Sequence, residues 1–207
     1  MPQERIEDTL MMLSIISNRT LNIMQHCIRV LEATNDNPTE HEQALINGNK
    51  MLAVIQISSF LDEWNTQFLR LKKDGIEVAR VEKVEVIAKP AFDVLALYPD
   101  IRNYRNWLLA HNRANVNRNY LNAYRGSLIA NLIVPANFSE FVLLARAVNE
   151  IAKAAQEVFE EYFIEPLDFV GLHTVPSTQV QRGNEECERI DLEMKQEIVR
   201  LKQQYNS

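Results

Sequence analysis

The sequence predicts an all-α fold, a bundle of about five main helices with a helical C-terminal extension. Apolar residues recur at three- and four-residue steps over most of the chain, which is the period of an amphipathic helix. Only five glycines and seven prolines occur in 207 residues, too few for the many turns of a β-sandwich or barrel. Hydrophobic residues make up 46% of the chain, which is sufficient for a packed core.

The first two predicted helices are long and follow each other directly. The first ends near residues 35–38, a segment of asparagine, aspartate and proline. Thr39 followed by Glu42 has the pattern of a capping box, which predicts the start of the second helix. This helix is expected to run to about Lys73, before Asp74-Gly75. We expect its inner side to carry Leu45, Leu52, Ile55, Phe60, Leu61, Trp64 and Phe68.

The remaining helices of the predicted bundle are shorter. A third stretch covers about 77–97 and is expected to bend or break at Pro90, because proline removes a backbone donor. A fourth covers roughly 101–113. The short apolar run 128–134 fits a helix or a strand equally well. A further helix, capped by Asn137 or Ser139, is predicted to reach about Phe163.

We expect two parts in the chain, a helical bundle over 1–165 and an appendage over 166–207. The appendage begins as a connector containing proline and glycine, and residues 185–205 then show a narrow apolar seam among charges. Such a seam usually packs on the body of the protein or pairs with a second copy.

Composition also restricts the class of protein. No apolar run approaches the roughly 20 residues needed to span a bilayer, and the N-terminal residues do not have the pattern of a signal peptide. Cys27 and Cys187 lie far apart without a metal-binding spacing. No glycine-rich phosphate loop occurs. These observations predict a cytoplasmic protein without membrane association, metal or cofactor.

Residues 101–139 form a cationic tract in an otherwise acidic chain. The tract contains five arginines, one histidine, nine asparagines and no acidic residue, whereas the whole chain has a formal charge of −6. A local cationic surface of this kind is typical of an anion site, and nucleic-acid phosphate is the commonest polymeric anion. The alternative is a solvated loop with turn-forming asparagines over 112–122.

Within the tract, Arg105, Asn106 and His111 are the strongest candidates for chemistry. On a helix, residues advance about 100° each, so Arg105 and His111 lie about 120° apart around the axis. A second copy of the helix, related by a two-fold axis, would make it easier to bring both side chains into one site. The other reading is that His111 is a core histidine.

The pattern Arg105-Asn106, four residues, then His111, on a helix that follows two long amphipathic helices, resembles the HEPN superfamily (higher eukaryotes and prokaryotes nucleotide-binding). The stretch Leu-Leu-Ala-His-Asn-Arg is similar to its abortive-infection branch. The resemblance is sharp over about 101–113 and only architectural over about 1–165. It implies an all-α bundle that dimerises with both motifs in one cleft. It also implies a metal-independent RNase of a toxin–antitoxin or phage-defence system, with RNA and an antitoxin protein as partners.

The resemblance further implies a role for each residue. His111 would act as general base or acid, for which an ordinary histidine pKa near 6.5 is suitable. Arg105 would hold the scissile phosphate, and Asn106 would orient the phosphate or the imidazole. Attack by the ribose 2′-hydroxyl would leave a 2′,3′-cyclic phosphate without a metal. The remaining arginines and tyrosines of the tract would bind phosphates and stack on bases: Arg102, Tyr104, Arg113, Arg118, Tyr120, Tyr124 and Arg125.

Two other interpretations remain open. The tract could belong to a non-catalytic module that binds RNA, a nucleotide or a protein, or it could be purely structural and mediate association. The enzyme interpretation predicts His111 exposed beside Arg105. The structural interpretation predicts Arg105 paired across the bundle with Asp62 or Glu63.

Overall fold

The computed structural model describes residues 2–110 and 132–162, apart from the side chains of 107–110. Its helices are α1 (Pro2–Ala33), α2 (Glu40–Glu63), α3 (Leu69–Lys73), α4 (Val78–Leu95), α5 (Ile101–Ala110) and α7 (Phe138–Val158). A π-helical turn, η1 (Trp64–Phe68), joins α2 to α3, and a 3-10 turn, η2 (Glu160–Tyr162), follows α7. No strand occurs in these ranges, which confirms the predicted all-α fold.

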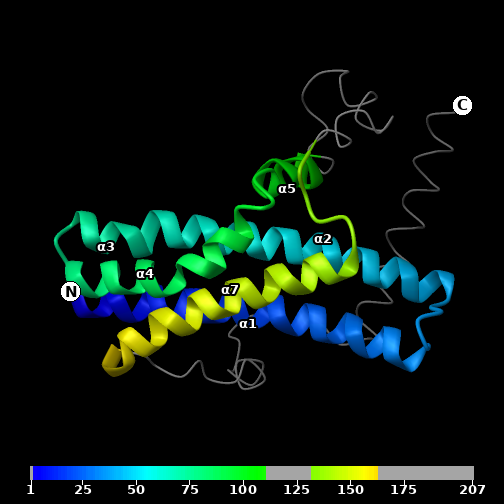
Figure 1. Ribbon diagram of the computed structural model, residues 1–207, viewed down its shortest axis with the longest axis horizontal. Helices are drawn as coiled ribbons and strands as arrows, with labels where there is room; N and C mark the ends of the chain where they lie inside the picture. The colour runs from blue at the N-terminus through cyan, green and yellow to red at the C-terminus, as the bar shows by residue number, and fades with distance from the viewer. Residues whose placement is uncertain (1, 111–131, 163–207) are drawn as a thin grey trace, which may run out of the picture. The chain divides into compact units, whose positions relative to one another are not determined.

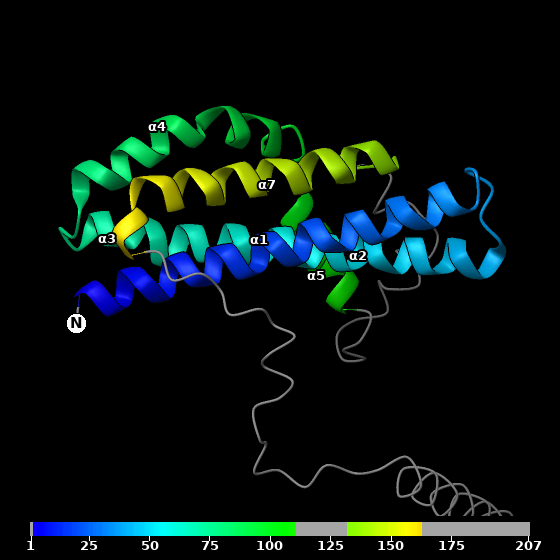
Figure 2. The same ribbon diagram turned by 90° about the horizontal axis from the view of Figure 1, so that it is seen from below.

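The long helices run along one another in alternating directions (Figure 1). Helices α1, α2 and α7 all contact one another, and α4 packs along α7, so that α7 lies between α4 and the α1–α2 pair (Figure 2). Helix α5 packs on α2. These elements belong to one compact unit, Met1–Pro166. Within the described ranges, every helix is too short or too polar to cross a bilayer. The predicted connector and helix over 166–207 lie outside them.

Local sequence determines where two of the long helices begin. The Thr39 side chain accepts a hydrogen bond from the Glu42 amide, and the Glu42 carboxylate accepts one from the Thr39 amide at 2.8 Å, which confirms the predicted capping box. Asn137 and Glu140 make the same reciprocal pair at the start of α7, so Asn137 and not Ser139 is the cap. These contacts satisfy amide groups that have no partner within the helix.

The core face of α2 differs from the predicted one. Phe60, Trp64 and Phe68 are buried as expected, and Ile55 and Leu61 are half-buried. However, Leu45 and Leu52 are exposed, and the neighbouring positions Ile46, Ala53, Val54 and Ile57 face the core instead. Apolar residues occur on two faces of this half of α2, so periodicity alone cannot choose between them, and contact with α1 and α7 makes the choice.

The predicted second helix is continuous to Lys73, but η1 interrupts its α-helical pattern. The Leu69 amide bonds to the Trp64 carbonyl, five residues back, as in a π-helix. Trp64 and Phe68 stack with their ring centroids 4.3 Å apart. Both rings are buried in the core.

Pro90 bends α4 without ending it. The α-helix extends from Val78 to Leu95 with Pro90 inside, and Figure 2 shows it curved over its length. Proline cannot donate to the carbonyl of Val86, one turn back, which loosens the helix at that point. Of the two expected outcomes, a bend or a break, the structure has the bend.

Arg80 connects the start of α4 to the end of α7 through hydrogen bonds. Its guanidinium Nε donates to the Val158 carbonyl at 3.0 Å, and its Nη2 donates to the Glu161 carboxylate at 2.6 Å. The guanidinium carbon also lies 4.6 Å from the centre of the Phe159 ring. A cation here satisfies a carbonyl at the C-terminal end of a helix, where the helix dipole favours positive charge.

We expect Glu161→Gln to reduce stability at neutral pH and to remove part of its acid dependence. The Arg80 hydrogen bonds lower the pKa of Glu161 from 4.5 to about 2. Because the pKa is depressed in the folded state, this carboxylate stabilises the fold above pH 4.5 and loses its contribution as the pH falls towards 2. Thermal unfolding measured from pH 6 to about pH 2 should therefore show a difference from the wild type that shrinks with acidification.

Glu160→Gln is the matched control, because this exposed neighbour has no ion-pair partner in the described part of the chain. It should leave the wild-type pH profile unchanged. A constant difference between Glu161→Gln and the wild type across the pH range would contradict the proposed linkage.

Candidate nucleic-acid interface

The candidate interface is built on the first turns of α5. The Asp100 carboxylate accepts hydrogen bonds from the Ile133 amide at 2.9 Å and from the Asn103 side chain at 3.0 Å. These bonds lower the pKa of Asp100, with the Ile133 amide as the main cause. The start of α5 is thereby tied to the segment that returns to the bundle before α7. Residues 132–134 are neither helix nor strand, and 128–131 lie outside the described ranges.

The inner face of α5 packs on α2. Ile101 is buried, and its carbonyl accepts a hydrogen bond from the buried Ser58 hydroxyl at 3.4 Å. Tyr104, predicted to stack on bases, is half-buried against the hydrophobic core, and burial raises the pKa of its phenol. This packing fixes the rotation of α5 about its axis and so decides which of its side chains meet α2.

Arg102 and Arg105 both converge on Asp62 of α2. Arg105 Nη1 is hydrogen-bonded to Asp62 Oδ2, and Arg102 Nε lies 3.2 Å from Asp62 Oδ1. The side chain of Arg105 is 21% exposed, whereas those of Arg102 and Asp62 are 43% and 44% exposed. Arg105 is therefore held largely against the protein, and Arg102 and Asp62 form the open part of the cluster.

Asn106 orients the Arg105 guanidinium from the other side. Its side-chain oxygen accepts hydrogen bonds from Arg105 Nε at 3.2 Å and from Nη2 at 3.1 Å. Together with the bond to Asp62, this occupies three of the five N–H groups of the arginine. The guanidinium is thus fixed in orientation, and its other two N–H groups have no partner among the residues that the structure describes.

The charge balance of this cluster is positive. The guanidinium groups of Arg102 and Arg105 lie against a single carboxylate, that of Asp62. The buried Nε of Arg102 makes no hydrogen bond within the described residues, despite its distance from Asp62, because its direction is unfavourable. Glu63, the next residue, is half-buried, and burial raises the pKa of its carboxyl. An external anion would find an attractive local field here.

The structure brings together three of the predicted site residues, Arg102, Arg105 and Asn106. It also shows the pairing of Arg105 with Asp62 that the structural interpretation predicts. The predicted catalytic residue His111 and the predicted RNA-binding residues Arg113, Arg118, Tyr120, Tyr124 and Arg125 lie outside the described residues.

Asp62 is the member of the cluster to which sequence analysis assigned no functional role. It is one of two adjacent acids at the end of a long helix, and it lies 43 positions before Arg105 in the chain. The structural interpretation named Asp62 and Glu63 as possible partners of Arg105, because an acid-free tract rich in arginine needs its counter-charges elsewhere in the chain. Which carboxylate supplies them depends on the packing of α5 against α2.

Comparisons with models of protein families, with curated proteins and with solved structures give no match for this chain.

Proposed function

We propose that this protein is a metal-independent endoribonuclease of a phage-defence or toxin–antitoxin type, and that the cluster on α5 is its phosphate-binding site. Arg105 holds the scissile phosphate, Asn106 keeps the guanidinium oriented, and His111 transfers the proton between the ribose 2′-hydroxyl and the leaving oxygen. The products are a 2′,3′-cyclic phosphate and a 5′-hydroxyl. An antitoxin protein is the expected regulatory partner.

The observation that carries this proposal is the convergence of two guanidinium groups on one carboxylate. One carboxylate can neutralise the charge of only one of these two arginines. Here a positive charge is left over, and Arg105 and Arg102 keep donors that suit the planar oxygens of a phosphate. Because this attraction comes from a local field in an acidic protein, RNA binding should weaken steeply with salt.

A second copy of the chain would complete the site. Arg105 and His111 lie about 120° apart if both are on one helix, so one copy presents them on different faces. The face of α2 that carries Leu45, Gly48 and Leu52 is exposed, and steps of three and four residues continue this face to Asp62, which contacts α5. An apolar stripe that leads to the charged cluster fits a homodimer whose two α5 helices meet.

The structural interpretation is the second candidate, and the Arg105–Asp62 ion pair favours it. In that case the cluster holds α5 on α2 and has no ligand. The two candidates differ in what Asp62 does. If RNA binds here, Asp62 competes with phosphate for the guanidinium groups. If the cluster is structural, Asp62 only supports the fold.

We therefore expect Asp62→Asn to strengthen RNA binding roughly fivefold at low salt, since an exposed ion pair contributes about 1 kcal/mol or less. Fluorescence anisotropy with a labelled single-stranded RNA measures the dissociation constant. Asp36→Asn is the matched control for net charge, because Asp36 is exposed in the turn after α1 with a φ of 57°, which asparagine tolerates. Unchanged or weaker binding by Asp62→Asn, with lower thermal stability, would support the structural candidate.

Catalysis is tested by incubating the wild-type protein with a panel of fluorescent RNAs in the presence of EDTA. Cleavage with cyclic phosphate ends is the expected result. Binding without cleavage would replace the enzyme by a non-catalytic RNA-binding module. Absence of both would leave the structural candidate.

A further inference from the structure

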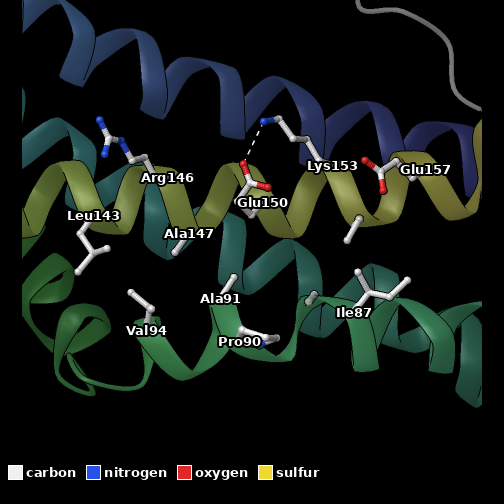
Figure 3. A pocket seen from close by; sticks show the side chains of 12 residues that line it. Ile87, Pro90, Ala91, Val94, Leu143, Arg146, Ala147, Glu150, Lys153 and Glu157 are labelled. Carbon is white, nitrogen blue, oxygen red and sulfur yellow. Dashed lines mark hydrogen bonds and ion pairs between the residues drawn. The ribbon is translucent and has the colours of Figure 1, made fainter.

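A groove with an apolar floor runs between α4 and α7, apart from the cluster on α5. Its volume is about 390 Å³. Figure 3 shows Ala91 and Val94 of α4 pointing towards Leu143 and Ala147 of α7 across this groove. Two large apolar side chains at this surface, Ile87 and Leu143, are 47% and 41% exposed. Val86, next to Ile87 on α4, is 75% exposed.

The outer face of α7 along this groove is charged in a regular order. Arg146, Glu150, Lys153 and Glu157 are all exposed, and at 100° per residue they fall within an arc of about 60°. Their signs alternate along the helix, positive, negative, positive, negative. Glu150 and Lys153 form an ion pair at 2.9 Å within the chain, drawn in Figure 3. Neither Arg146 nor Glu157 has an ion-pair partner in the part of the chain that the structure describes.

We propose that this α4–α7 face binds the same face of a second copy of the chain, about a two-fold axis that crosses α7 between Ile151 and Ala152. The axis reverses the direction of the second α7. Each Arg146 then lies opposite Glu157 of the other copy, and each Glu150 lies opposite Lys153 of the other copy. When the four alternating charges are read in the opposite direction in the second copy, every positive charge meets a negative one. An isologous interface needs this kind of self-complementarity.

The apolar side chains of α4 at this groove are related by the same two-fold axis. Figure 3 shows Pro90 and Ala91 across from the turn that holds Ala147 and Glu150, about one turn away from the axis on α7. The axis therefore sets this stretch of α4, with its exposed Ile87, against the same stretch of the other copy. The result is an apolar centre made by four helices, with the α7 charge pairs at its edge.

This interface is separate from the one in the proposed function. Helix α5 packs on α2, and Figure 2 shows it on the side of the bundle away from α4. Self-association through α4 and α7 does not require RNA binding or catalysis, and substitutions on one face leave the other face intact. A chain that uses both faces would assemble beyond a dimer.

The test is the molar mass in solution, measured by light scattering during size exclusion, with 24.0 kDa as the mass of one chain. Arg146→Glu places like charges opposite each other in both symmetry-related pairs, and we expect the mass to fall to half that of the wild type, with more than about tenfold weaker self-association. Glu157→Arg should have the same effect. The double variant Arg146→Glu/Glu157→Arg restores opposite charges and should restore the wild-type mass.

An equimolar mixture of the two single variants gives a sharper result. Each pair in the mixed assembly joins a glutamate to an arginine, so the mixture should regain the wild-type mass although neither variant does so alone. Arg29→Glu on α1, an exposed position with the same change of charge, should not alter the mass. Equal masses for the wild type and Arg146→Glu, or a folded double variant that stays dissociated, would overturn the proposal.

Discussion

RNA cleavage is expected to disappear when either Arg105 or His111 is replaced by alanine. General acid–base catalysis by a histidine contributes about 10²- to 10⁴-fold to the rate, and removal of a group that stabilises developing charge costs about 10²- to 10³-fold. In the proposed mechanism Arg105 supplies charge at the phosphate and His111 moves the proton. Initial rates on a fluorescent RNA with EDTA present measure both effects.

Matched controls exist for both positions. Arg29 and His26 are exposed on α1, and alanine at either position should leave the rate unchanged. Circular dichroism should show an unchanged helical spectrum for all four variants. Equal cleavage by the wild type, Arg105→Ala and His111→Ala would mean that the activity comes from a contaminant or from another site, and would contradict the proposed roles.

The largest effect on stability is expected at Phe68. Its side chain is fully buried, stacks on Trp64 and meets the edge of Phe159 with the ring centroids 6.0 Å apart. Phe68→Ala removes these contacts and leaves a cavity where α7 ends against η1. The free energy of unfolding should fall by about 3 to 5 kcal/mol, as for other buried phenylalanines. Urea unfolding followed by circular dichroism measures this change.

Leu97→Ala provides the comparison for Phe68→Ala. Leu97 is 60% exposed, and truncation there should change the free energy of unfolding by less than about 0.5 kcal/mol. Similar losses in the two variants would show that the aromatic contacts of η1 are not a centre of stability. A small loss in Phe68→Ala alone would mean that the core rearranges to fill the cavity.

The short-range features of the fold could be predicted from the sequence because their causes are local. Thr39 and Glu42 are three residues apart, as are Asn137 and Glu140, and each pair forms a capping box between near neighbours in the sequence. The same is true of the turn at Gly75, whose φ of 73° suits a residue without a side chain. These local signals, with the three- and four-residue period, were enough for the fold class.

Which face of a helix is buried depends on contacts with residues that are distant in the chain. Leu45 and Ile46 are adjacent and equally apolar, yet Leu45 is exposed and Ile46 is buried. No local property separates them, and only the position of α2 against α1 and α7 does so.

The sequence by itself determined that this chain is helical, where its main helices begin, and that five of its arginines lie in one acid-free tract. Tertiary structure decided which carboxylate meets them, since Asp62 and Arg105 come together only when α5 packs on α2. It also decided that Ile87, Leu143 and the charges of α7 share one surface, because they belong to helices that are far apart in the chain. Periodicity fixes the faces of one helix, whereas charge pairing and grooves arise between helices and depend on how they pack.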